Sequence, residues 1–199
     1  VYVDTINCGD VIDTKKAWAS RWEWLDKVPS FESFDAIDAA RLADGLSLAL
    51  LRPKRLLGLD ITKARNPDWT DEEREKLLQE QMQGNLFSEM EERKQVKQLR
   101  KVPFDFHYRY VCDTPDGDKE HKHKIVDWEA GALFWNCYQR HGTNGWEQPF
   151  RAKLEEDLGS KELMFLMGNQ HRFQDQWLIV SLIYPPKRKP LDERQGQLF

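Results

Sequence analysis

An alternating run of aromatic and charged residues constrains the fold of this 199-residue chain more than any other feature. Between Phe104 and Cys112, aromatic or apolar side chains occupy every second position, and charged or polar side chains fill the positions between. Successive strand residues point to opposite faces of a sheet, so the run predicts an antiparallel strand with one buried face. The residues from Thr114 to Gly117 match a type I turn, and residues 119–126 return as the second strand of a β-hairpin.

Two helices and two strands are predicted after the hairpin. Asp127 is placed to cap a helix whose apolar residues surround most of its circumference, so this helix is expected to be buried between layers, and Gly142 ends it. A second helix is expected over about 148–158, with a proline tolerated in its first turn. Residues 162–168 and 177–186 are continuous apolar runs, which is the pattern of strands covered on both faces.

A small α+β lobe is predicted over residues 1–66. Trp18, Trp22 and Leu25 recur at helical spacing, which favours a packed helix over a base-stacking role for the tryptophans of this stretch. An Ala-rich helix that Gly45 can close comes next, followed by two apolar strands on either side of Pro53.

A charged connector is expected between this lobe and the hairpin. Thr70 and Glu73 form a capping-box pattern at the start of a helix over about 71–83, and the polar residues that follow favour an exposed segment. The predicted fold class is α+β, with a mixed or antiparallel sheet, a β-hairpin, two packed helices and two buried C-terminal strands. The predicted units are an N-terminal lobe (1–66), a connector (67–101), a core lobe (102–186) and a flexible tail (187–199).

Composition narrows the class of protein. A hydrophobic fraction of 40% with eight Trp and ten Phe argues against disorder. No apolar run approaches the roughly 20 residues that span a bilayer, and no signal peptide is visible, so a cytoplasmic protein is expected. The cysteines are odd in number and widely separated, which favours a reducing compartment.

A net charge of −4 argues against nucleic-acid binding through the overall field of the protein. Two short basic clusters remain as candidate nucleic-acid contacts, with a solvated surface as the alternative interpretation. Their candidate residues are Lys122, Lys124, Lys187 and Arg188.

One short motif occurs twice. Gln83-Gly84-Asn85-Leu86-Phe87 and Gln195-Gly196-Gln197-Leu198-Phe199 share the form Q-G-x-L-F. It resembles the Q-x-x-L-F peptide by which bacterial replication and repair proteins dock on the DNA sliding clamp.

The resemblance implies an accessory or adaptor protein of bacterial DNA maintenance, repair or defence. The implied partner-binding residues are Gln195, Leu198 and Phe199 in the tail, and Gln83, Leu86 and Phe87 in the internal copy. The alternatives are a tail without a partner and an internal Leu-Phe pair packed on the core.

A polar loop over 168–176 supports a second hypothesis, a nucleic-acid- or nucleotide-processing enzyme. His171 would be the general acid or base and Arg172 a phosphate ligand, with Asp127 or Glu129 nearby. The alternative is a turn that satisfies its own backbone groups. A third hypothesis is a structural subunit of a larger nucleoprotein complex that uses its aromatic-rich hairpin or Trp-rich helix as the contact surface.

No metal and no cofactor are predicted. His121 and His123 project from one face of the second hairpin strand, with His107 expected across the hairpin, but a solvated hairpin face is favoured over a zinc site. Segments of the second half, including PFDFHYRY and ELMFLMGNQHRF, resemble a group of prokaryotic hypothetical proteins. That resemblance implies no activity.

Overall fold

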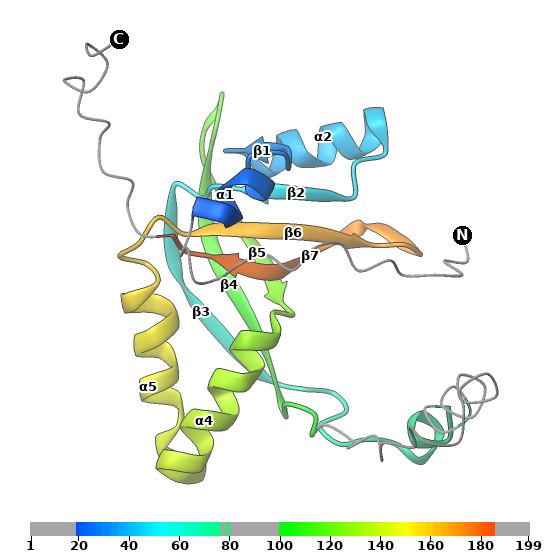
Figure 1. The fold of residues 1–199 in the computed structure, drawn as a ribbon, viewed down its shortest axis with the longest axis vertical. Helices are drawn as coiled ribbons and strands as arrows, with labels where there is room; N and C mark the ends of the chain where they lie inside the picture. The colour runs from blue at the N-terminus through cyan, green and yellow to red at the C-terminus, as the bar shows by residue number, and fades with distance from the viewer. Residues whose placement is uncertain (1–18, 77–78, 80–99, 186–199) are drawn as a thin grey trace.

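The computed structural model describes residues 19–76, 79 and 100–185, which build one seven-stranded mixed sheet with helices packed against it (Figure 1). The predicted α+β class with a mixed sheet is confirmed. The strand order is β1-β2-β6-β7-β5-β4-β3. The strands are β1 (Ser30–Phe31), β2 (Leu48–Leu51), β3 (Arg55–Lys63), β4 (Phe104–Thr114), β5 (Gly117–Ile125), β6 (Met164–Gln170) and β7 (Phe173–Ile183).

Two antiparallel hairpins form the centre of the sheet. β4 pairs with β5 and β6 pairs with β7, and the two hairpins meet through a short parallel pairing in which Lys124 lies opposite Leu178 and Ile125 opposite Ile179. The hairpin predicted from the alternating run is therefore confirmed. Its second strand is followed by helices that return the chain to the other side of β7, which is why β5 and β7 run parallel.

Strands from the segment before residue 67 complete both edges of this same sheet. β2 pairs with β6 on one side, and β3 pairs with β4 on the other. The boundary expected at residue 66 therefore does not separate an independent lobe, because its strands share their hydrogen bonds with strands of the core. Residues 71–76 are helical, and the capping box is present: the Thr70 N–H donates to Glu73 at 3.0 Å and the Glu73 N–H to Thr70 Oγ1 at 3.2 Å.

α2 (Phe34–Asp44) lies near one end of the sheet, and α4 (Trp128–Gly145) and α5 (Glu147–Arg151) lie near the other (Figure 1). α2 ends at Gly45, whose φ of 69° is the left-handed conformation expected of a closing glycine. α4 is interrupted at Gly142, as predicted, and α5 continues into a π-helical turn, η3 (Ala152–Asp157). α1 (Ala19–Leu25) is the short N-terminal helix. No helix among the described residues is long and apolar enough to span a membrane.

The aromatic side of β4 forms the core, as its alternation predicts. Tyr108 and Tyr110 are fully buried, and the Tyr108 ring stacks on Phe165 of β6 at a centroid distance of 5.5 Å. The Tyr108 hydroxyl donates to the Leu154 carbonyl of η3 at 2.7 Å. Phe150 of α5 packs on the same face. The second predicted helix thus buries its apolar stripe against the predicted strand face.

One expectation for α4 is wrong. The helix is buried on one side only, at Ala130, Phe134 and Cys137, while Trp128 is 75% exposed. The sheet can cover only one side of a helix, so Trp128 lies at the surface of the described structure, while Leu133, Trp135 and Tyr138 are partly buried.

A single carboxylate joins α4 to the sheet. Asp127 is only 8% exposed, and its Oδ1 accepts hydrogen bonds from the N–H groups of Glu129 at 2.6 Å and Ala130 at 3.4 Å. Its Oδ2 accepts from the Leu182 N–H of β7 at 2.7 Å. β7 is irregular just before this point, because the pairing with β6 shifts between Leu166 and Met167. The predicted N-cap is confirmed, and the same carboxylate is also hydrogen-bonded to β7.

Replacing Asp127 by Ala is expected to lower the free energy of unfolding by about 2–4 kcal/mol, since it removes an N-cap and leaves the buried Leu182 N–H without its acceptor. Asp127→Asn keeps an acceptor oxygen and should cost less. Urea unfolding measures both. Asp116→Ala in the exposed hairpin turn is the control, and a loss in D127A no larger than in this control would contradict the role of the carboxylate.

Candidate functional site

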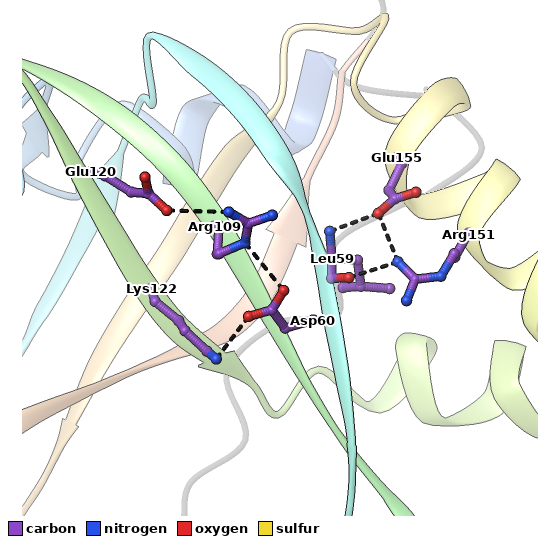
Figure 2. A network of polar contacts seen from close by, with 7 residues as sticks. All are labelled: Leu59, Asp60, Arg109, Glu120, Lys122, Arg151 and Glu155. Carbon is purple, nitrogen blue, oxygen red and sulfur yellow. Dashed lines mark hydrogen bonds and ion pairs between the residues drawn. The ribbon is translucent and has the colours of Figure 1, made fainter.

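The solvent-facing side of β3, β4 and β5 carries a network of paired charges. Figure 2 shows Arg109 between two acids: its side chain lies 3.1 Å from Asp60 and 3.4 Å from Glu120. Lys122 Nζ lies 2.7 Å from the other Asp60 oxygen. The hydrogen bond from Lys122, with help from Arg109, holds the pKa of Asp60 below its usual range.

The candidate nucleic-acid contacts on this face are already paired with acids. Lys122 faces Asp60, and Lys124 lies 2.7 Å from Asp105. A phosphate would have to compete with these carboxylates, so the face as a whole offers little net positive charge. Lys187 and Arg188 lie outside the described residues.

The edge of β3 is closed by two side chains from the helical layer (Figure 2). Glu155 accepts a hydrogen bond from the Leu59 N–H at 2.7 Å, and Arg151 donates to the Leu59 carbonyl at 2.6 Å. Arg151 and Glu155 also form an ion pair of 3.0 Å. Together they occupy the backbone groups through which another strand would pair at this position.

The structure does not bring the proposed enzymatic residues together. β6 and β7 extend through most of the predicted loop, which leaves His171 and Arg172 as an exposed two-residue turn. Asn169 Nδ2 donates to the Gln174 carbonyl at 3.0 Å beside this turn. Asp127 contacts Leu182, ten residues along β7 from Arg172, which corresponds to about 30 Å of strand. A shared site of His171, Arg172 and Asp127 is therefore absent among the described residues.

The histidines of the hairpin occupy different faces. His121 and His123 lie on the buried face beneath α2, where the Phe34 ring lies 5.1 Å from His121 and 4.4 Å from His123 by centroid distance. His107 pairs with Lys124 in the ladder and lies on the opposite face, beside the charged network. The expected solvated histidine face is wrong, because α2 covers it. Within the described part of the chain, no group of three His, Cys, Asp or Glu side chains is arranged to hold a metal ion.

Burial gives His123 unusual acid–base properties. Its Nδ1 lies 2.8 Å from the Tyr110 hydroxyl, and desolvation, with smaller contributions from His121 and His107, lowers its pKa to about 4. Burial also lowers the pKa of His121 and of His107. The sequence analysis identified the shared face of His121 and His123 from their period-2 spacing but missed its burial beneath α2.

An apolar pocket of about 560 Å³ lies between α4 and the adjoining ends of β4 and β5. Its lining includes Phe104, Phe106, Trp128, Trp135, Arg100 and Lys124. The Arg100 guanidinium lies 4.1 Å from the centre of the Trp135 ring. A second pocket, of about 370 Å³, shares Arg100 and Trp135 and extends toward Trp69. The first pocket, with its mainly apolar walls, has dimensions that accommodate a small molecule or peptide side chains.

The predicted partner-binding peptides lie outside the described residues. This concerns Gln83, Leu86 and Phe87 of the internal copy, and Gln195, Leu198 and Phe199 of the tail. Their role stays a prediction from the motif.

Comparison with known proteins places the chain in a family. A family model described as a domain of unknown function, DUF8757, matches residues 30–199. The chain belongs to this family. The matched DUF8757 region contains all seven strands of the sheet, α2, α4 and α5, and the Q-G-x-L-F tail. No curated protein and no solved structure matches the chain.

The buried histidine predicts a specific pH dependence for the DUF8757 chain. His123 titrates near 6.5 when unfolded and near 4 when folded, so its neutral form is favoured by folding. The contribution of neutral His123 to the free energy of unfolding is complete above pH 6.5 and is lost as the pH falls toward 4. The expected loss from His123 alone is about 2 kcal/mol between pH 7 and pH 5.

Urea unfolding at the two pH values tests this expectation. In His123→Gln, the decrease in the free energy of unfolding between pH 7 and pH 5 should be smaller by about 2 kcal/mol, because the titrating group is gone. Tyr110→Phe is the matched control, since it removes the hydroxyl partner but leaves His123 buried and should keep the pH dependence. An unchanged pH dependence in H123Q would show that this site is not responsible.

Proposed function

We propose that this protein is an accessory or adaptor protein of bacterial DNA maintenance, repair or defence that docks on the DNA sliding clamp through Gln195–Phe199. The observation that carries the proposal is the Q-x-x-L-F spacing of these residues. In this mode Leu198 and Phe199 enter an apolar pocket of the clamp, while Gln195 forms hydrogen bonds at its rim. The body of the protein would then be localised by the clamp rather than by its own affinity for DNA.

The position of the peptide relative to the folded body suits this role. The described structure ends at Pro185, after β7, and nine residues, 186–194, precede Gln195. Nine residues span up to about 30 Å when extended. This length lets the peptide engage a partner while the sheet and helices stay outside the partner's pocket.

The surface of the body supports a role in protein contacts. Trp128 is 75% exposed and Trp24 is 53% exposed, whereas tryptophan is usually buried over most of its surface. Exposed tryptophans are typical anchors of protein interfaces. The enzyme hypothesis required His171 and Arg172 to converge with Asp127 or Glu129, so the arrangement of β7 lends it no support.

Binding to purified bacterial sliding clamp tests the proposal. The double variant Leu198→Ala/Phe199→Ala is expected to bind at least about 100-fold more weakly than the intact chain, because it removes two apolar anchors worth roughly 1.5–3 kcal/mol each. Isothermal titration calorimetry measures the affinity.

The internal copy of the motif supplies the matched control. Leu86→Ala/Phe87→Ala should keep most of the affinity if the tail is the docking peptide. Equal binding by the tail variant and the intact chain, or no binding by the intact chain, would overturn the proposal.

A further inference from the structure

The pocket between α4 and the ends of β4 and β5 is an apolar surface that the fold leaves open within the described residues. Its floor is formed by Val102, Phe104, Phe106 and Ile125, and Trp128 and Trp135 stand along α4. Val126 and Trp128 at its margin are 44% and 75% exposed. A cluster of exposed apolar side chains around a pocket marks a docking surface.

We propose that this pocket docks the Leu198–Phe199 pair of the chain's own last five residues. Docking in the pocket does not depend on the proposed clamp function. If that function holds, the pocket and the clamp compete for the same two side chains, and the pocket regulates recruitment.

The end of β7 lies beside the start of α4, which borders the pocket. The Leu182 N–H donates to Asp127, which lines the pocket, and the Tyr184 hydroxyl donates to Glu129 at 3.3 Å. The described chain therefore ends, at Pro185, next to the start of α4. It is at this start that Trp128 borders the pocket.

The intervening sequence is long enough for this docking. Twelve residues, 186–197, separate Pro185 from Leu198 and span up to about 40 Å when extended. The stretch of α4 that lines the pocket, from Trp128 to Gln139, is about 17 Å long. A tether of this length holds the peptide at an effective concentration of about millimolar, so even a weak contact would be substantially occupied.

The charges of the tail follow the same order as the charges beside the pocket. The basic residues 187–189 come first after Pro185, where the exposed Glu129 lies. The acidic residues 192–193 come later, and Arg100 lies farther along the pocket. Arg100 stacks on Trp135, and within residues 19–76 and 100–185 no acid forms an ion pair with it.

A nucleic acid is a poorer occupant for the same pocket. Lys124 is paired with Asp105 at 2.7 Å, and the pocket also contains the Asp127 carboxylate. The positive charges of Arg100 and Lys124 are balanced by the negative charges of two acids in the lining, Asp105 and Asp127. Nucleic-acid binding depends on an excess of positive charge.

Photo-crosslinking of the full chain without clamp tests the docking. With Phe199 replaced by p-benzoylphenylalanine, irradiation should give cross-links within one molecule to residues 100–106 or 124–139, identified by mass spectrometry. The same group at Leu191, outside the motif, is the control and should give at least fivefold less of these products. Equal yields from both positions, no cross-link to these residues, or cross-links only between two molecules would overturn docking within one chain.

Filling the pocket provides an independent test. Ala132 lines the pocket on α4, and Ala132→Trp should lower the cross-link yield at least fivefold. Ala39→Trp, on the exposed side of α2, is the matched control and should leave the yield unchanged. Thermal unfolding within about 2 °C of the intact chain confirms that both variants fold, and an unchanged yield in folded A132W would overturn the proposal.

Clamp binding separates this inference from the proposed function. If both are correct, A132W releases the tail and raises the apparent clamp affinity about 2–10-fold. An intact chain that cross-links as described but does not bind the clamp would overturn the proposed function alone. Unchanged clamp affinity in A132W would overturn the competition between pocket and clamp.

Discussion

The carboxylate of Asp127 connects the helical layer of this protein to its sheet. One oxygen satisfies the first N–H groups of α4, and the other accepts the Leu182 N–H from β7. The hydrogen bonds from Ala130 and Leu182 are buried, and a buried N–H without an acceptor costs about 1–3 kcal/mol. The direction in which α4 leaves the sheet is therefore tied to the position of the last strand. The apolar pocket and the exit point of the tail both lie beside this junction.

The two faces of the hairpin have different physical roles. The side that carries Tyr108 and Tyr110 is sealed by aromatic packing and by the Tyr108 hydroxyl bond to Leu154. The other side consists of alternating acids and bases whose charges are mutually satisfied around Asp60 and Arg109. This face therefore suits solubility better than recognition of one charged ligand. The features suited to recognition are apolar and lie between α4 and the adjoining ends of β4 and β5.

Local sequence patterns predicted most of the elements because each depends on neighbouring residues. The period-2 alternation after Phe104, the cap at Asp127 and the closing glycines Gly45 and Gly142 are short-range signals with a direct physical cause. The structure contains all of them. The exposure of Trp128 was not predictable in this way, because it depends on which side of α4 the sheet covers. The burial of His123 depends in the same way on the placement of α2, which is distant in sequence.

The sequence by itself determined most of the strands and helices, the helix start at Asp127 and which side of β4 is apolar, since these follow from backbone preference and from the spacing of side chains. It also contains the Q-G-x-L-F peptides, whose recognition would depend on a few consecutive residues. Only the tertiary structure decided that β2 and β3, which precede the hairpin in the chain, extend one sheet on opposite sides. It alone placed His171 far from Asp127 and brought the end of β7 to the start of α4. These arrangements depend on hydrogen bonds and packing between segments distant in sequence, whose pairing no local pattern specifies.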